Sequence, residues 1–335
     1  MSKKILQNSK GQIALELPVP SKTVTRREIG QALERLGASV GIPAMAFLVF
    51  LGIWSMASAR IDTSLGKLPG PPQVWVQAQD LWKEHWTEQA KQKEFYQKQA
   101  EQNAQKLAED PAAKVKVRKY TGRPTYLSQI LTSLVTVFTG FFLASIVAVP
   151  VGILCGLNRT IRMACNPFIQ LFKPISPLAW LPLVTMVVSA VYTVNGGVEK
   201  CFIISAVTVA LCSLWPTIIN TAQGVSSVDK DIINVSRVLK LGWFTHVFKI
   251  ILPSSLPLIF TGLRISLGVG WMVLIASEML AQNPGLGKFV WDEFQNGSSN
   301  SLARIMVAVL TIGAIGFVLD RMMVMLQKSV SFQSR

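Results

Sequence analysis

Long uncharged apolar runs recur along this chain and restrict its possible folds more than any other feature of the sequence. They fall near residues 41–59, 129–157, 175–192, 201–219, 256–280 and 302–326. Because an α-helix rises 1.5 Å per residue, about 20 residues cross the roughly 30 Å of hydrocarbon in a bilayer. The sequence therefore predicts an all-α, polytopic membrane protein with about six transmembrane helices.

The composition argues against a water-soluble globule. Half of the 335 residues are hydrophobic and 15% are charged, which leaves too little polar surface to cover a soluble fold of this size. Residues 1–40 are polar and basic, and they lack the apolar stretch and small-residue cleavage site of a signal peptide. We therefore expect this segment to remain on the mature protein.

Lys and Arg residues are unevenly divided between the two sides of the predicted spans. With the N-terminus inside, the inner flanks hold most of them, and the short outer loops hold Lys200, Lys288 and Arg304. Since cytoplasmic loops carry the excess of positive charge, this bias predicts a multi-pass protein of the inner membrane with both termini in the cytoplasm.

The predicted organisation has five parts. They are a cytoplasmic tail over 1–40, a first transmembrane helix over 41–59, an extracytoplasmic insertion over 60–126, a five-helix core over 127–326, and a cytoplasmic tail over 327–335. Within the first tail, residues 25–39 alternate basic and apolar side chains as an amphipathic helix on the lipid surface would.

The insertion is predicted to contain a long polar helix over 77–110. This stretch is rich in Ala, Gln, Glu and Lys, lacks Gly and Pro, and stops before Pro111, as a soluble helix does. Trp82, Trp86, Phe95 and Tyr96 lie within its first 20 residues. Two interpretations stay open, a solvated spacer and a docking surface for an extracytoplasmic partner.

The sequence contains no nucleotide-binding or catalytic motif. Gly-x-x-x-x-Gly-Lys-[Ser/Thr] is absent, and the nearest match, at 285–288, is too short, so we expect no ATP site on this chain. His85 and His246 are isolated, and the four cysteines form no Cys-x-x-Cys pair. We therefore expect no metal site on this chain. The net charge is +15, but the basic residues are not interleaved with surface aromatic residues. We therefore expect no nucleic acid as a partner.

The loop over 224–250 is the most informative polar segment. Its residues 231–239 place Ile232, Val235, Val238 and Leu239 on one helical face, and Gly242 follows as a break. This spacing predicts a short amphipathic helix on the cytoplasmic surface.

At this loop the sequence resembles the permeases of ABC importers, whose hallmark is Glu-Ala-Ala, three residues, Gly, and later Leu-Pro. Counting back from Leu252-Pro253 places Asn234-Val235-Ser236 at the Glu-Ala-Ala positions and Lys240 at the glycine position. The resemblance implies that this helix docks into a cleft of an ATPase and transmits its motion. The implied coupling residues are Asp231, Asn234, Val235, Ser236, Val238, Leu239, Lys240 and Gly242.

Other stretches resemble one branch of that family, the permeases for nitrate, bicarbonate, sulfonate and taurine. They include Ser176-Pro177-Leu178-Ala179-Trp180-Leu181-Pro182, Trp215-Pro216-Thr217-Ile218-Ile219-Asn220-Thr221, 260–265, 270–280, 285–287 and 290–292. The first two are most similar to nitrate/nitrite and bicarbonate permeases of cyanobacteria. Residues 83–119 depart from the family pattern and read as an insertion, to which no family role transfers.

The resemblance implies the type I ABC importer permease fold and a set of partners. These are a second copy of the chain, two ABC ATPase subunits that bind ATP and Mg²⁺, an extracytoplasmic substrate-binding protein, and membrane lipid. No cofactor is expected on this chain. Nitrate or nitrite is the favoured substrate; bicarbonate and sulfonate or taurine stay open, and a passive channel or membrane scaffold is the alternative of another class.

Polar and aromatic residues within the spans are candidates for the translocation path. They are Ser176, Trp180, Trp215, Arg264, Trp271, Met272 and Glu278. For Arg264, snorkelling or a salt bridge to an internal carboxylate stays open, because an intramembrane charge is costly unless it has a partner. Glu278 is expected to form a structural or gating pair in preference to a contact with the substrate. Gly262, Ser266 and Gly270 recur every four residues and predict close helix packing.

Overall fold

The computed structural model describes residues 41–63, 66–109, 115, 117–192, 197–298 and 300–330. The amphipathic helix predicted at 25–39 lies outside the described residues. The chain divides into two units, 1–57 and 58–335, which are treated separately. The first unit contributes most of α2 (Ile42–Arg60), an apolar helix of 19 residues that falls where the first span is predicted.

The second unit begins with a small hairpin and a long helix. Strand β1 (Asp62–Thr63) pairs antiparallel with β2 (Gly66–Lys67), with Asp62 opposite Lys67. Helix α3 (Pro71–Glu109) then runs for 39 residues, roughly 58 Å at 1.5 Å per residue. The helix begins at Pro71, which agrees with the preference for proline in the first turn of a helix. Val74 and Leu81 are buried and hold its first half against the rest of the unit.

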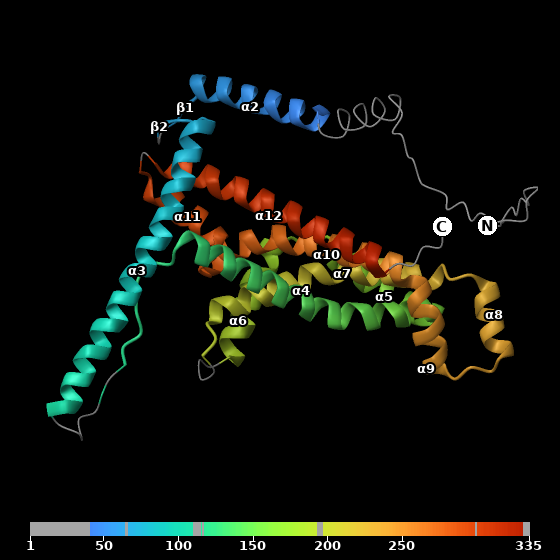
Figure 1. The fold of residues 1–335 in the computed structure, drawn as a ribbon. Coiled ribbons are helices and arrows are strands. Elements are labelled where there is room, and N and C mark those ends of the chain that lie inside the picture. Colours follow the sequence, from blue (N-terminus) through green and yellow to red (C-terminus); the bar gives the residue numbers. More distant parts are fainter. Residues whose placement is uncertain are drawn as a thin grey trace, which may run out of the picture. The chain divides into compact units, whose positions relative to one another are not determined.

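The remaining helices follow in chain order. They are α4 (Tyr126–Leu157), α5 (Arg159–Phe172), α6 (Pro177–Val191), α7 (Lys200–Ser226), α8 (Lys230–Val238), α9 (Trp243–His246), the π-helical turn η2 (Val247–Ile251), α10 (Leu252–Ala281), α11 (Leu286–Asn296) and α12 (Ser301–Val330). Within this unit α3 and α11 lie at one end of the long helices, and α8 and α9 lie at the other (Figure 1). We call these the α11 end and the α8 end.

Five helical stretches of the described chain are long and apolar enough to cross a membrane: Ile42–Arg60, Tyr126–Leu157, Lys200–Ser226, Trp243–Ala281 and Ser301–Val330. A sixth is counted only if α5 and α6, bent by 101°, act as one broken span. The sequence predicts a single span over 175–192, but α6 has 15 residues and is too short to cross about 30 Å alone.

The break between α5 and α6 has a local cause. Ser176 caps α6 by accepting a hydrogen bond from Leu178 N at 3.3 Å, and Pro177 occupies the first helical position. A capping serine followed by proline begins a new helix and does not continue the old one. The hydropathy pattern shows the apolar α6 but hides α5, whose polar face makes it look like a loop.

Helix α7 lies between α4 and α10 in the packed core, and small residues allow the close approach. A Cβ on Gly152 of α4 would lie 2.6 Å from Thr221 Cβ, and one on Gly262 of α10 would lie 2.8 Å from Asn220 Cβ. Ser266, one turn beyond Gly262, hydrogen-bonds Thr217 at 2.7 Å. A Cβ on Gly270 would lie 2.7 Å from Ser213 Oγ, so Gly262, Ser266 and Gly270 all face α7.

Candidate functional site

Helix α8 exposes an apolar face at the α8 end of the molecule. Ile232, Val235, Val238 and Leu239 are 43%, 57%, 82% and 63% exposed. Burying an aliphatic side chain of this size is worth about 1.5–3 kcal/mol, so a row of them on the surface makes this face a candidate interaction surface. Asn234 and Asp231 are also exposed on this helix.

The opposite side of α8 is fastened to the helix bundle. Ser236 is 3% exposed, and its hydroxyl hydrogen-bonds His246 Nδ1 of α9 at 2.6 Å. Ile233 packs on a cluster of Val225, Val228 and Ile251, which joins the end of α7 to η2. A force on the exposed face of α8 therefore reaches α7 and, through η2, α10.

The C-terminus of α8 is closed by a left-handed residue. Leu241 N donates to Ser236 O at 3.2 Å, and Lys240 has φ +47°, the arrangement in which glycine is usual. Lys240 is also the position that the resemblance matches to the motif's glycine. Gly242, predicted as the break, lies between α8 and α9, where it has φ −61° and is the N-cap residue of α9. The left-handed turn itself is made at Lys240.

Ser176, Trp180 and Trp215 come together at the junction of α5 and α6. The Phe172 ring lies 5.9 Å from the rings of both Trp180 and Trp215, and it stacks on Trp215 at 9°. Both indole nitrogens are buried without a hydrogen-bond partner in the described chain. Unpaired buried donors are rare because each costs about 1–3 kcal/mol, and an anion's oxygen is the kind of acceptor that would satisfy them.

Arg264 is paired with a carboxylate on the neighbouring helix. Its Nε and Nη2 donate to Asp320 Oδ1 and Oδ2 at 2.5 and 2.8 Å, which joins α10 to α12. This is the salt bridge to an internal carboxylate that the sequence left open beside a role in the path. Trp271 of α10 is buried and donates to Ile312 O at 3.0 Å, whereas Met272 is 70% exposed.

Glu278 lies in a buried cluster of polar groups near the α11 end. Its carboxylate accepts hydrogen bonds from Ser133 Oγ at 2.8 and 2.9 Å and from Gly287 N at 2.9 Å. Ser133 in turn accepts from Leu286 N at 2.8 Å. A Cβ on Gly285 would overlap the Glu278 carboxylate. The carboxylate thus fixes α11 against α4 and α10, and the hydrogen bonds that it accepts from Ser133 and Gly287 come from neutral donors.

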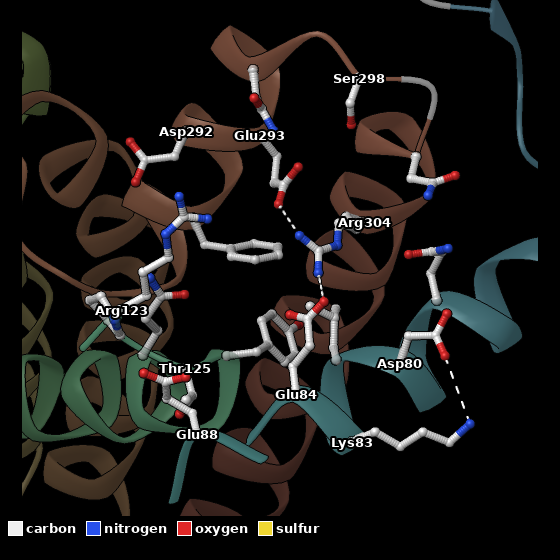
Figure 2. Close-up of a pocket in the computed structure, with 18 of the residues that line it drawn as sticks. Asp80, Lys83, Glu84, Glu88, Arg123, Thr125, Asp292, Glu293, Ser298 and Arg304 are labelled. Carbon is white, nitrogen blue, oxygen red and sulfur yellow. Dashed lines mark hydrogen bonds and ion pairs between the residues drawn. The ribbon is translucent and has the colours of Figure 1, made fainter. Parts of the chain in front are cut away.

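A large open cavity of about 1150 Å³ lies between α3, α4, α11 and α12 (Figure 2). Among the described residues that line it, acidic and basic side chains are equal in number. The acidic residues are Asp80, Glu84, Glu88, Asp292 and Glu293. The basic residues are Lys83, Lys91, Arg123, Lys288 and Arg304. Sequence reasoning missed this cavity because α3 belongs to the insertion, to which the resemblance does not extend.

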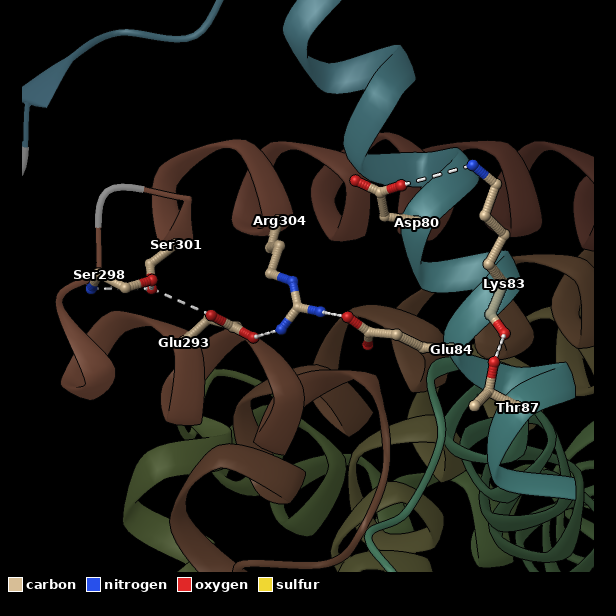
Figure 3. Close-up of polar contacts among 8 residues, drawn as sticks. All are labelled: Asp80, Lys83, Glu84, Thr87, Glu293, Ser298, Ser301 and Arg304. Carbon is tan, nitrogen blue, oxygen red and sulfur yellow. Dashed lines mark hydrogen bonds and ion pairs between the residues drawn. The ribbon is translucent and has the colours of Figure 1, made fainter. Parts of the chain in front are cut away.

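Arg304 connects three helices in that cavity. Its guanidinium contacts Glu84 of α3 and Glu293 of α11, the latter at 2.8 Å (Figure 3). Ser301 Oγ donates to the second oxygen of Glu293 at 3.0 Å. Charge-assisted bonds of this kind are stronger than neutral ones. Arg304 is visible in the sequence merely as a cation of an outer loop, and its two partners could not be found there.

The insertion folds back on itself. Residues 117–122, which we call the strap, run along α3, where Tyr120 Oη donates to Glu88 at 2.7 Å and Tyr120 N donates to Tyr96 Oη at 3.2 Å. Gln99 Nε2 adds a bond to Arg118 O at 3.3 Å. The hydrogen bond from Tyr120 lowers the pKa of Glu88, and the same bond raises the pKa of Tyr120.

These features define a class of protein, a helical membrane transport subunit with an exposed amphipathic helix at one end. A family model described as the inner membrane component of binding-protein-dependent transport systems matches residues 148–332. The chain belongs to this family.

The curated relatives include permeases of cyanobacteria. The chain is 38% identical over 201 residues to the bicarbonate transport system permease protein CmpB of Synechococcus elongatus, covering 60% of this chain and 68% of that one. It is 35% identical over 207 residues to the nitrate import permease protein NrtB of the same organism, covering 62% and 71%. It is thus an ABC importer permease close to both kinds.

A solved structure supports the fold independently. The chain aligns with the inward-facing MetNI methionine ABC transporter at a TM-score of 0.51 and 15% identity, covering 61% of this chain and 95% of that chain. The expected type I ABC importer permease fold is therefore confirmed.

Proposed function

We propose that this chain is the permease subunit of an ATP-driven importer of a small planar oxyanion, with nitrate or nitrite first and bicarbonate as the other candidate. The observation that carries the proposal is the exposed apolar face of α8, tied on its other side to α7 and η2. Relatives named for nitrate and for bicarbonate support the substrate class. A passive channel would need no such helix.

The proposed mechanism is alternating access driven by partner subunits. Two ABC ATPases bind ATP and Mg²⁺, and their closure moves α8, which pulls on α7 and α10 through the cluster of Val225, Val228 and Ile251. A second copy of the chain completes the pathway. Binding energy then shifts the population from inward-facing to outward-facing states. This chain carries no catalysis of its own in that scheme.

The proposed orientation places the α8 end and both termini in the cytoplasm and the α11 end outside. The excess of Lys and Arg on the inner flanks supports it. Substrate would arrive at the α11 end from an extracytoplasmic binding protein. Sulfonate or taurine is the remaining alternative, since permeases for those anions belong to the same branch of the resemblance.

Uptake by cells that express the chain together with its ATPase and substrate-binding partners tests both coupling and substrate. Val235→Asp with Val238→Asp should abolish accumulation of ¹⁵N-nitrate or ¹⁴C-bicarbonate and stop the ATPases from co-purifying. Val117→Asp is the matched control, because Val117 is 79% exposed on the strap and lies far from α8. Unchanged uptake by the α8 variant would contradict the coupled importer, and the anion that accumulates identifies the substrate.

A further inference from the structure

A second cavity lies at the α8 end, between α5 and the C-terminal turns of α4 and α7. It has a volume of about 390 Å³ and is lined by Cys155, Arg162, Asn166, Ile169, Gln170, Lys173, Ile219, Ala222, Gln223 and Ser226. This volume falls within the usual range of small-molecule sites. Among these lining residues are two cations, three carboxamides and a hydroxyl, and there is no carboxylate.

One face of α5 supplies most of the polar groups. Arg162, Asn166, Gln170 and Lys173 are spaced at about one helical turn and point to the same side, while Asn158 caps the helix through Thr160 N at 2.8 Å. Because α5 carries these residues, with Lys173 as its C-cap, their backbone positions are fixed relative to one another.

Arg162 is oriented before any ligand arrives. Its Nε and Nη2 donate to Cys155 O and Gly156 O, each at 3.0 Å. These bonds satisfy carbonyls at the C-terminus of α4, and they use two of the five N–H donors of a guanidinium. The remaining donors are available to an oxyanion, and the negative end of the α4 dipole is offset.

The charge of this cavity differs from that of the cavity at the α11 end. There the lysines are paired: Lys83 with Asp80 at 3.9 Å, Lys91 with Glu88 at 3.5 Å, and Lys288 with Asp292 at 2.9 Å. Within the described chain, neither Lys173 nor Arg162 has an acidic partner within 4.0 Å. The two cations that line this cavity therefore have no ion-pair partner among the described residues, which favours an anion.

Two lining residues are close in sequence to the aromatic group at the junction of α5 and α6. Ile219 lies one helical turn from Trp215 on α7, and Lys173 directly follows Phe172. Neither Trp180 nor Trp215 lines the cavity, so the charged and polar groups of α5 and α7 are its donors.

We propose that this cavity is a binding site for a small monovalent oxyanion such as nitrate or bicarbonate. Arg162 and Lys173 supply the charge, and Asn166, Gln170 and Gln223 donate amide N–H groups to the oxygens. The inference rests on the proposed function in one respect: the ligand is the transported anion. In that case this cavity is the last site that the anion occupies before its release.

Calorimetric titration of the permease with its ATPase subunits, in nanodiscs of phosphatidylcholine, tests the site directly. Nitrate and bicarbonate are the probes. Lys173→Gln and Asn166→Leu should each raise Kd about tenfold, as loss of a hydrogen bond to a charged group does. Arg159→Gln is the matched control, since Arg159 begins α5 without lining the cavity, and it should change Kd by less than about twofold.

Two further arms separate the possible sources of the anion and the two proposals. If neither anion binds to the unmodified complex, but phosphatidylglycerol co-purifies with it and is lost in Lys173→Gln, the cavity holds a lipid phosphate and the inference is wrong. If both variants lose binding yet transport at the normal rate, the site is off the transport path and the inference is again wrong. Failure of the unmodified complex to transport any oxyanion would contradict the proposed function instead.

Discussion

Arg264 of α10 and Asp320 of α12 form a bidentate ion pair, with Nε to Oδ1 at 2.5 Å and Nη2 to Oδ2 at 2.8 Å. The pair joins two long apolar helices that sequence places 56 residues apart. Because a planar guanidinium matches a carboxylate in this geometry, a lysine could not reproduce both bonds.

Removal of one partner should therefore cost more than removal of both. Asp320→Ala leaves an unpaired arginine between the spans, and we expect the melting temperature in detergent to fall by a few degrees. Arg264→Gln combined with Asp320→Ala should recover part of that loss, because no charge is left alone. A double-mutant cycle measures the coupling. Strictly additive losses would show that the pair makes no contribution.

The glycines around Glu278 are required by close packing, and this too can be tested. A Cβ on Gly287 would overlap the carbonyl oxygen of Ile275 and lie 2.8 Å from Glu278 Cβ. Gly287→Ala should therefore destabilise the protein by about 2–3 kcal/mol, as overpacking does. Gly313→Ala is the control, since nothing lies within 4 Å of a Cβ there. Equal melting temperatures for the two variants would contradict the packing described at α11.

The left-handed Lys240 at the end of α8 predicts a stabilising substitution. Lys240→Gly should raise stability by about 1 kcal/mol, because a side chain at φ +47° carries a steric cost that glycine avoids. Lys249→Gly is the matched control. It places glycine inside the helical turn η2, where it should destabilise by a similar amount. Chemical denaturation in detergent measures both, and a destabilised Lys240→Gly would show that the turn is not strained.

Sequence reasoning located elements whose signal is local and missed those that depend on distant partners. The apolar runs predicted α2, α4, α7, α10 and α12, because span length and lack of charge are properties of one segment. The amphipathic α5 was missed because its polar face lowers the mean hydropathy of the segment. Counting back from Leu252-Pro253 was enough to place Lys240 at the position where the family motif has glycine.

The candidate site shows the same division. Glu278 could be selected as a carboxylate in an apolar run, but Ser133 lies 145 residues earlier, and no local pattern connects the two. Arg304 and Glu84 are 220 residues apart. Such contacts are created by the packing of α3 and α4 against α10, α11 and α12, so they become visible only in the folded chain.

The strap and α3 provide a prediction of pH dependence. The pKa of Glu88 is lowered by the hydrogen bond from Tyr120. A lowered carboxyl pKa means that the contact stabilises the strap fully above the ordinary pKa of glutamate, and that this stability is lost as pH falls through the lowered value. Protection of the strap amides from hydrogen exchange should therefore decrease over that acidic range.

One variant in the strap and one in α3 isolate the contribution of Glu88. Tyr120→Phe should reduce strap protection at neutral pH and remove its pH dependence, when compared with the unmodified chain at each pH. Glu94→Gln is the control, because Glu94 pairs with Lys98 on the exposed side of α3 at 2.6 Å and does not contact the strap. A pH response that persists in Tyr120→Phe would assign it to another group.

Arg304 provides a last prediction, which concerns the attachment of α3 to the transport core. Its two partners differ in burial: the side chain of Glu293 is 9% exposed, whereas that of Glu84 is 57% exposed. Glu293→Gln should cost about 2–3 kcal/mol, since it weakens buried charged bonds to both Arg304 and Ser301. Glu84→Gln should cost about 0.5 kcal/mol, as exposed ion pairs do, yet it should increase hydrogen exchange in the first half of α3. Thermal unfolding with exchange mass spectrometry measures both effects, and a larger stability loss for Glu84→Gln would reverse the assigned order.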